Sequence, residues 1–339
     1  MAGSRLGLAL EQAAGDERWG LYGPRGDADL SAFDPARTEV IQGFFPDYRA
    51  LANAGFDVRT EPQTPHDAAI VFLPRARAEA RARVAEAAGR LRPGAALWID
   101  GQKTDGVDAM LRDLRGFVAV DQMDSRAHGR IFRVIVPDGA WLPADWAAAP
   151  IAAAPGFTTM PGMFSADAPD PASELLAAHL PAKLPSRIVD LGAGWGWLAA
   201  QALRHPGVTA LHLVEADHAA LECARRNITD PRAVFHWADA RDFHLPEPVN
   251  GVIMNPPFHD GRAADPGLGR AFIQTAARLL TGAGTLWMVA NRQLPYEQVL
   301  RECFRDSAEI AGDGRFKVLT ATGAMSRRPA PKGKPPRRR

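Results

Sequence analysis

The stretch with the clearest chemical potential is Asn255-Pro256-Pro257-Phe258-His259-Asp260-Gly261, which follows the apolar run 251–254. That run is typical of a buried strand in a parallel sheet. Proline has no amide hydrogen and a fixed φ, so two prolines end the strand and hold the backbone carbonyls in a rigid turn. A planar molecule with an exocyclic amine can donate to the Asn255 side-chain oxygen and the Pro256 carbonyl while Phe258 stacks on its ring. An ordinary strand-ending turn uses the same residue types, so this stretch alone leaves both interpretations open.

A glycine-rich turn upstream supplies a second candidate element. Residues 187–191 are predicted as a strand, and Gly192-Ala193-Gly194-Trp195-Gly196-Trp197 leads from it into a helix that runs to Arg204. Glycines let the backbone approach a ligand closely, and a helix N-terminus offers unpaired N–H groups. The dinucleotide pattern G-x-G-x-x-G fails because Trp197 stands at its third glycine position. The pattern acid-x-G-x-G-x-G, which begins at Asp190, fits instead.

Two further acids follow predicted strands. Residues 210–215 end in Glu215, whose carboxylate can accept both hydroxyls of a ribose, and Asp239 follows the strand 234–237, where it can accept from an adenine amine. A solvated loop acid is the alternative for Glu215 taken alone, and Asp217 is interpreted as a helix cap. Open α/β sheets bind ligands at the carboxyl ends of their strands. The order of glycine turn, strand-end acids and Asn255 therefore predicts a nucleoside-containing cofactor.

The first half of the chain alternates strand and helix patterns but has no glycine fingerprint after any strand. This alternation predicts a layered α/β domain without the parts for nucleotide chemistry. Residues 137–156 have no sustained period and are predicted as a linker, and Asp170-Pro171 is predicted to cap a helix that ends at His179. Strands are predicted over 19–23, 38–45, 67–73, 95–100 and 131–136, and helices over 75–91, 107–114 and 219–226.

Composition narrows the class of protein. A chain of 339 residues is long enough for two domains with separate cores. No apolar run reaches the roughly 18 residues of a membrane helix, and the N-terminus lacks the apolar segment of a signal peptide. Two cysteines, Cys223 and Cys303, are too few for a disulfide scaffold or a thiolate metal cluster. We therefore expect a cytoplasmic protein without a metal and without a membrane partner.

The net charge of +1 hides a basic end. Residues 326–339 contain seven Arg and Lys side chains and no acid. Such a Pro- and Arg-rich segment cannot bury apolar surface and is expected to be disordered. It can neutralise the phosphates of a nucleic acid, or it can simply aid solubility.

The segments VDLGAGWG, LVEAD and NPPF together resemble class I S-adenosylmethionine-dependent methyltransferases that modify exocyclic amines. Longer segments, PGMFSADAPD, NPPFHDG, ANRQLPYEQVL and GRFKV, with GQKTDGVDAML in the first half, resemble the 16S (small-subunit) ribosomal RNA guanine-N2 methyltransferase family. The likeness is weak before residue 70 and strong after residue 157. The sequence departs from the family pattern at Trp195 and Trp197, in having Glu rather than Asp at 215, and in its basic tail. None of these departures removes a required chemical group.

The resemblance implies two Rossmann-like methyltransferase-type α/β domains in tandem: a degenerate domain over 1–150 that positions RNA or serves as scaffold, a catalytic domain over 157–325, and a basic tail over 326–339. It implies transfer of a methyl group to the N2 amine of a guanine in ribosomal RNA of the small subunit. His259, Arg315 and Lys317 are then candidates for RNA contact, with a solvated hairpin as the alternative for the last two. The implied catalytic corner comprises Asn255, Pro256, Pro257 and Phe258. The implied S-adenosyl-L-methionine site comprises Asp190, Gly192, Ala193, Gly194, Gly196, Glu215, Asp239 and Asn255.

Other functions use the same residues. Methylation of adenine N6 in DNA or RNA, of guanine N2 in large-subunit RNA, or of protein glutamine needs the same amine-holding corner. A non-catalytic RNA-binding assembly factor is a further alternative, against which the intact stretch 255–258 argues, and Trp197 disfavours a nucleotide-linked oxidoreductase. The sequence leaves open which nucleotide is modified, whether naked RNA or an assembled subunit is the substrate, and whether the first domain binds RNA. It leaves the oligomeric state open too, with a monomer as the simplest expectation.

Overall fold

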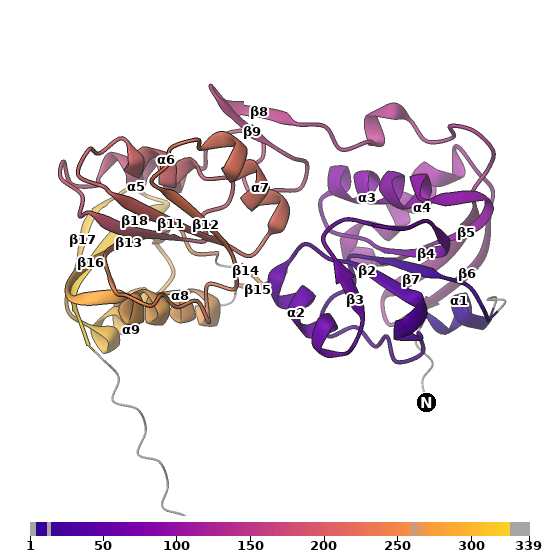
Figure 1. The fold of residues 1–339 in the computed structure, drawn as a ribbon, viewed down its shortest axis with the longest axis horizontal. Coiled ribbons are helices and arrows are strands. Elements are labelled where there is room, and N and C mark those ends of the chain that lie inside the picture. The colour runs from indigo at the N-terminus through magenta and orange to yellow at the C-terminus, as the bar shows by residue number, and fades with distance from the viewer. Residues whose placement is uncertain (1–4, 12–14, 258, 261–262, 265, 326–339) are drawn as a thin grey trace, which may run out of the picture. The chain divides into compact units, whose positions relative to one another are not determined.

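The computed structural model describes residues 5–11, 15–257, 259–260, 263–264 and 266–325 (Figure 1). For those between 259 and 266 only the backbone is described. Of the described residues, those within Met1–Pro169 and Ala216–Asn227 form one compact unit, and those within Asp170–Glu215 and Ile228–Arg339 form a second. No helix among them is long and apolar enough to cross a membrane.

The first unit is built on a seven-stranded sheet in the order β3-β2-β1-β4-β5-β7-β6. Its strands run parallel except at β5–β7 and β7–β6, which pair antiparallel. The strands are β1 (Trp19–Tyr22), β2 (Thr38–Ile41), β3 (Asp57–Arg59), β4 (His66–Phe72), β5 (Leu91–Gln102), β6 (Val120–Arg126) and β7 (Gly129–Ile135). The helices are α1 (Gly7–Glu11), α2 (Phe45–Asn53), α3 (Arg77–Gly89), α4 (Val107–Arg115) and α7 (His218–Asn227), with 3₁₀ turns η1 (Pro35–Arg37), η2 (Lys103–Asp105) and η3 (Ala144–Trp146).

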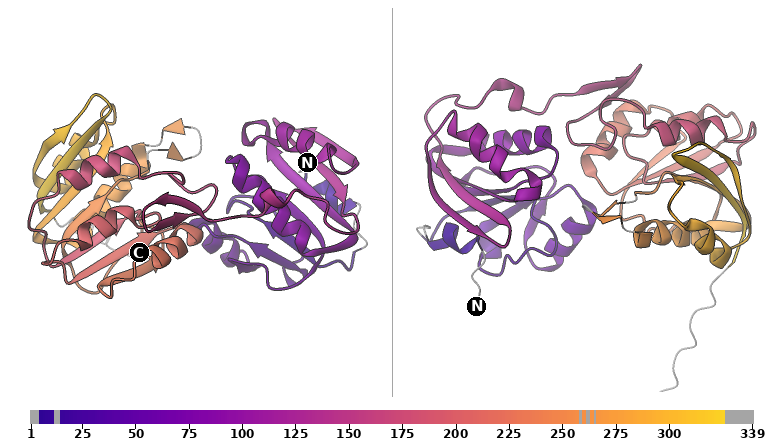
Figure 2. Two further views of the ribbon diagram at one scale, coloured as in Figure 1. Left: turned by 90° about the horizontal axis from the view of Figure 1, so that it is seen from above. Right: turned by 180° about the vertical axis from the view of Figure 1, so that it is seen from behind.

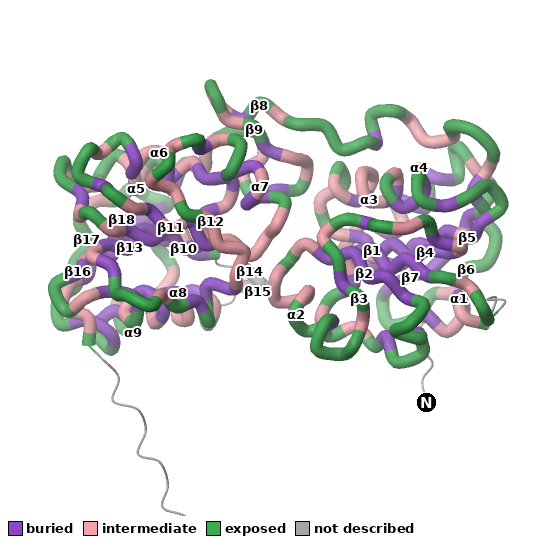
Figure 3. The backbone as a smooth tube through the Cα atoms, viewed as in Figure 1, coloured by how far each residue is buried: buried purple, intermediate pink, exposed green. Residues whose placement is uncertain are grey.

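The sheet of the first unit separates two apolar layers. On one face Val71 and Leu97 pack with Val84 of α3 and Leu114 of α4, and the other face buries a second cluster that includes Trp98. The central strands are the most deeply buried part of the unit, as Figure 3 shows. This is the pattern expected of a parallel sheet covered on both faces.

The second unit has a seven-stranded sheet in the order β12-β11-β10-β13-β16-β18-β17. Helices α5 and α6 lie on one face of this sheet and α8 and α9 on the other (Figures 1 and 2). The strands are β10 (Arg187–Leu191), β11 (Ala210–Glu215), β12 (Ala233–Trp237), β13 (Val249–Met254), β16 (Leu280–Asn291), β17 (Phe304–Gly312) and β18 (Phe316–Ala324). The helices are α5 (Pro171–Ala178), α6 (Trp197–Leu203), α8 (Pro266–Leu279) and α9 (Tyr296–Cys303), and β14 (His259–Asp260) pairs with β15 (Ala263–Ala264).

The two sheets share one topology. In each, the first strand in sequence lies third in the sheet, the strands from it to the fifth run parallel, and the last two pair antiparallel. The predicted tandem arrangement of two α/β domains is therefore confirmed.

Four predicted segments need correction. The helix predicted over 75–91 ends at Gly89, because Leu91 already belongs to β5. The strand predicted over 38–45 ends at Ile41, because Pro46 stands in the first turn of α2 and fixes a helical φ there. The strand predicted over 95–100 begins earlier, at Leu91. The predicted linker 137–156 contains η3 and the start of a hairpin formed by β8 (Ile151–Ala154) and β9 (Phe157–Thr159).

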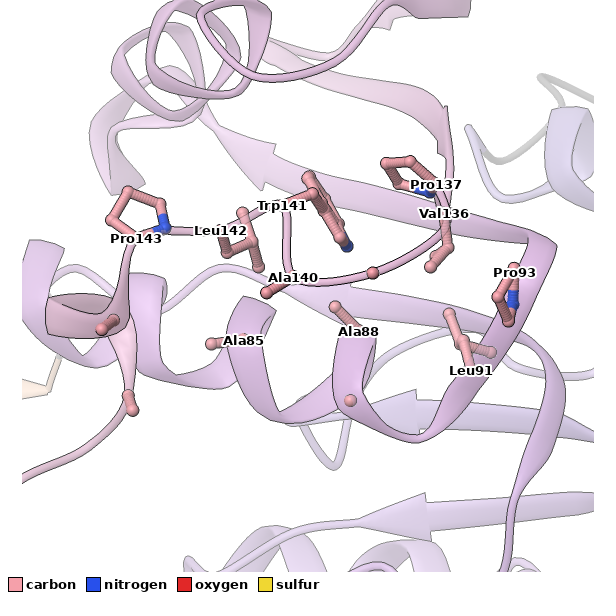
Figure 4. Close-up of a pocket in the computed structure, with 14 residues that line it drawn as sticks. Ala85, Ala88, Leu91, Pro93, Val136, Pro137, Ala140, Trp141, Leu142 and Pro143 are labelled. Carbon is pink, nitrogen blue, oxygen red and sulfur yellow. The ribbon is translucent and has the colours of Figure 1, made fainter.

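The linker also packs against α3 and, together with that helix, lines an open pocket of about 410 Å³ (Figure 4). Trp141 and Leu142 face Ala85 and Ala88 across this pocket. The apolar side chains of the segment explain why it adheres to the first unit despite its lack of periodicity.

Candidate functional site

The glycine turn of the second unit follows β10 directly. Gly192 and Gly194 have φ angles of 77° and 54°, which favour glycine. A Cβ on Gly192 would lie 3.2 Å from the ring of Phe272, whereas a Cβ on Gly194 would meet nothing within 4 Å. The turn is thus packed on one side and faces open space at Gly194, the second predicted glycine position.

Asp190 lies on β10 just before this turn and is 1% exposed. Neither of its carboxylate oxygens has a hydrogen-bond partner of good geometry among the described residues. Burial, and secondarily the nearby Glu215 carboxylate, raise the pKa of Asp190 to about 8, although the Ala199 backbone N–H is near enough to lower the pKa of this carboxyl slightly. A buried carboxyl group of this kind is costly in the absence of a donor, so the site is built to receive one.

Glu215 ends β11 and reaches back to the turn. Its Oε2 atom accepts the Gly194 N–H at 2.7 Å. The side chain is half-buried. The structure therefore brings three predicted cofactor residues, Asp190, Gly194 and Glu215, to one edge of the sheet.

Asp239 lies beyond β12 and is 5% exposed. Its Oδ1 accepts from the Arg241 backbone N–H and Nε, each at 2.9 Å, and its Oδ2 accepts from Arg241 Nη2 at 2.7 Å. An ionised carboxylate offers about four lone-pair sites. Asp239 can thus accept a further donor, but its contacts with Arg241 also give it a structural role in this turn.

Asn255 follows β13 and is held on one side. Its Nδ2 donates to Asp170 Oδ2 at 2.8 Å and to Ser173 Oγ at 3.0 Å. The carboxylate only accepts, so it fixes which end of the amide faces it, and the Asn255 side-chain oxygen is the end left to accept from a ligand. Pro256 is buried and Pro257 exposed. Phe258 lies outside the described residues.

The other predicted RNA-contacting residues lie in different surroundings. His259 pairs with Ala264 through the backbone of β14 and β15, and its side chain is outside the description. Arg315 is exposed, with its guanidinium 4.8 Å from the ring centroid of Phe316. Lys317 is 4% exposed and forms an ion pair with Glu297. Arg315 is therefore the better placed of the two basic side chains for phosphate contact.

The first unit provides an internal comparison because its hydrogen bonds define equivalent positions. The Gly23 N–H donates to the Ile41 carbonyl at 2.7 Å, and the Gly192 N–H donates to the Val214 carbonyl at 2.9 Å. Both glycines directly follow their strands and have positive φ. Gly23 is thus equivalent to Gly192, and Ile41 to Val214.

The strand registers extend this equivalence across both sheets. The position of Asp190 is taken by Leu21, that of Glu215 by Gln42, and that of Asn255 by Phe72. Leu21 and Phe72 are thus apolar where the second unit has the polar residues Asp190 and Asn255.

In the first unit, a side chain occupies the space beside the glycine turn at Gly23. The Arg83 guanidinium lies where a Cβ on Gly23 would be, and it donates to the Phe72 carbonyl at 3.0 Å. The crossover between β1 and β2 carries only the short turn η1 in place of α6. At the three equivalent positions, the described residues of the first unit thus include neither acid of the second unit and no Asn.

Sequence reasoning missed the contact of Asp170 and Ser173 with Asn255. Asp170 is confirmed as the N-cap of α5, since its Oδ2 accepts the Ser173 N–H at 2.9 Å. The helix-capping pattern alone accounts for an Asp at position 170, so nothing in the sequence indicates that Asp170 also accepts a hydrogen bond from Asn255. Nor do the described residues include a group of three His, Cys, Asp or Glu side chains that could hold a metal.

Comparison with known proteins gives the family. Residues 155–320 match the Methyltransferase small domain, and residues 29–141 match the Methyltransferase small domain N-terminal. A protein of Klebsiella pneumoniae named Ribosomal RNA small subunit methyltransferase C is 31% identical over 261 residues, which cover 74% of each chain. A protein of the same name from Pseudomonas paraeruginosa is 31% identical over 286 residues, covering 81% of this chain and 84% of its own.

A solved structure has the same fold. It is described as T. Thermophilus 16S rRNA N2 G1207 methyltransferase (RsmC) in complex with AdoMet and Guanosine, and it is 23% identical with a TM-score of 0.78. The alignment covers 95% of this chain and 92% of that one. The expected pair of Rossmann-like methyltransferase-type domains is thereby confirmed. With these relatives and the site at the carboxyl ends of β10, β11 and β13, the chain belongs to the ribosomal RNA small subunit methyltransferase C family.

Proposed function

We propose that this protein transfers the methyl group of S-adenosyl-L-methionine to the exocyclic N2 amine of a guanine in small-subunit ribosomal RNA. The observation that carries the proposal is the Asn255 amide, anchored through its nitrogen at the end of β13. Leu191 and Met254 are register partners, so the glycine turn and the Asn255 corner begin on neighbouring strands. Neighbouring strands lie about 4.8 Å apart, which brings cofactor and amine sites together.

The residues at this edge fit the cofactor. The buried Asp190 carboxyl suits the ammonium group of the methionine part, and the open space at Gly194 suits a close approach to the backbone. Glu215 suits the ribose hydroxyls and Asp239 the adenine amine. When bound, the cofactor would supply a methyl group on a sulfonium, from which a neutral thioether departs as a good leaving group.

The corner residues act on the base. The guanine amine is a poor nucleophile, because its lone pair is delocalised into the ring. Two acceptors, the Asn255 side-chain oxygen and the Pro256 carbonyl, favour the pyramidal amine and stabilise the positive charge that develops on nitrogen. The proton becomes acidic only after transfer, so alignment rather than a general base is the main requirement.

The relatives support the substrate. Those described above are named for the small ribosomal subunit, and the Thermus structure is described with guanosine. Phe258 is the proposed platform for a base extruded from its helix, and Arg315 the proposed phosphate contact. A ribosomal RNA substrate supports the proposal that the protein acts in the cytoplasm.

The test is methyl transfer from tritiated cofactor to small ribosomal subunits or their naked RNA, followed by mass analysis of the modified nucleoside. We expect N2-methylguanosine, and Asn255→Ala should abolish it while cofactor affinity changes little. Asn250→Ala is the matched control, because Asn250 lies on the same strand away from the corner and should keep activity. A product methylated at adenine N6 or on protein glutamine would replace the proposed substrate, and full activity of Asn255→Ala would refute the assigned role.

A further inference from the structure

We propose that Asp170 and Ser173 are positioning residues that hold the Asn255 amide in its productive orientation. The proposal rests on the function given above and extends it to two residues outside the strand-end motifs. Asp170 lies 85 residues before Asn255 in the sequence, yet its Oδ2 accepts from Asn255 Nδ2 at 2.8 Å. Ser173 Oγ accepts from the same nitrogen at 3.0 Å.

The orientation of this amide decides what it can do. A side-chain amide has a donating end and an accepting end of nearly the same shape. Turned the other way, Asn255 would present N–H groups to an amine that also donates, and its oxygen would face a carboxylate. The Asp170 carboxylate accepts only, so it permits one orientation, and a hydrogen bond to a charged acceptor is stronger than one to a neutral acceptor.

The holding atoms are themselves fixed. Asp170 Oδ2 also accepts the Ser173 N–H at 2.9 Å, which caps α5, and Pro171 sets the backbone of the first turn. Buried Ala172 and Leu176 attach this helix to the unit. The Asp170 Oδ2 atom therefore accepts hydrogen bonds from both the first turn of α5 and the Asn255 amide. Because the helix cap fixes this oxygen, it also fixes the Asn255 side chain.

Three variants separate positioning from capping. Asp170→Ala removes both hydrogen bonds that Oδ2 accepts, one from the Ser173 N–H and one from Asn255 Nδ2. Ser173→Ala removes the hydroxyl that accepts from Asn255 but keeps the backbone N–H that Asp170 caps. Asp170→Asn keeps a side-chain oxygen that can accept both hydrogen bonds. Asp34→Ala is the matched control, because Asp34 belongs to the first unit and caps η1 through the Ala36 N–H at 3.0 Å.

We expect kcat to fall about 10- to 100-fold in Asp170→Ala and about 3- to 10-fold in Ser173→Ala. Asp170→Asn should recover most of the loss, and Asp34→Ala should keep the wild-type kcat. The Kd for S-adenosylmethionine, measured by calorimetry, and the KM for the subunit should change little in all four variants. This split between kcat and binding is what a purely structural cap would not produce.

Two results would overturn the inference: a wild-type kcat in both Asp170→Ala and Ser173→Ala, or an Asp170→Asn variant as slow as Asp170→Ala. If Asp170→Ala fails to fold, Ser173→Ala decides alone, since it retains the cap. Loss of the inference is distinct from loss of the proposed function. An inactive Asn255→Ala with a fully active Ser173→Ala and Asp170→Ala would remove only the positioning role, whereas an active Asn255→Ala would remove the function.

Discussion

Replacement of Asp190 by Asn tests the cofactor site through stability. The native carboxyl group has a pKa of about 8, against 3.8 in the unfolded chain. Between these values the native state holds a proton that the unfolded state has lost, so the wild-type free energy of unfolding falls as pH rises. At pH 7 the cost amounts to about 1.4 kcal/mol for each of about 3 pH units, or about 4 kcal/mol. An Asn at this position carries no such cost.

The measurement is the midpoint of thermal unfolding of both proteins between pH 4 and pH 8 without cofactor. Each kcal/mol shifts the midpoint of a unit of this size by about 2–4 °C, so the advantage of Asp190→Asn should grow by about 8–16 °C between pH 4 and pH 7. Asp230→Asn is the control. Hydrogen bonds from the Arg232 side chain and backbone lower the pKa of Asp230 from 3.8 to about 2. Its contribution to stability is therefore complete above the unfolded pKa of 3.8 and is lost as pH falls from there to about 2. Its difference from wild type should stay flat from pH 5 to pH 8.

Cofactor binding should show the opposite effect. If Asp190 receives the ammonium group, its carboxyl releases the proton to solvent and forms an ion pair, which Asn cannot do, so Asp190→Asn should bind S-adenosylmethionine about tenfold more weakly at pH 7. A difference in midpoint that is the same at pH 5 and pH 8 would refute the raised pKa. A variant with gained stability and an unchanged Kd would refute the contact with the cofactor.

Three further outcomes are expected. Glu215→Ala should weaken cofactor binding about tenfold, read from tryptophan fluorescence, because the ribose acceptor and the contact with Gly194 are lost; an unchanged titration contradicts the ribose assignment. Deletion of 326–339 should weaken RNA binding mainly at low salt. It should also reduce the slope of log Kd against log salt concentration, by the contribution of up to about seven phosphate contacts; an identical slope would mean that the tail does not contact RNA. Lys317→Met should cost no more than about 1 kcal/mol in denaturant unfolding, because the Glu297 side chain is 42% exposed and water screens the charge left behind, and a loss of RNA affinity in this folded variant would support the predicted phosphate contact.

The sequence predicted the parts of the fold that are locally determined. The bounds of β10 and β11 agree with prediction because each is an apolar run closed by a glycine turn or an acid. Helix α5 was predicted from Asp170-Pro171, which fix both its cap and its first φ. The candidate residues Asp190, Gly194 and Glu215 meet because parallel strands of one sheet end at the same edge.

The missing parts depend on contacts between distant segments. Lys317 is buried on β18, which lies between β16 and β17, and it pairs with Glu297 on α9. No local pattern distinguishes it from exposed Arg315. The contact between Asp170 and Asn255 joins a helix cap to a strand end, and it requires the packing of α5 against the sheet to be known first.

The residues at the equivalent positions of the first unit mean that no single substitution can give it a cofactor site. A carboxylate in place of Leu21, which is wholly buried, would put a charge in the core with no cofactor able to meet it. An Asn in place of Phe72 would gain nothing while the Arg83 guanidinium occupies the space at Gly23. A second methyl-donor site in this protein would therefore require several substitutions at once, most of them unfavourable when made alone.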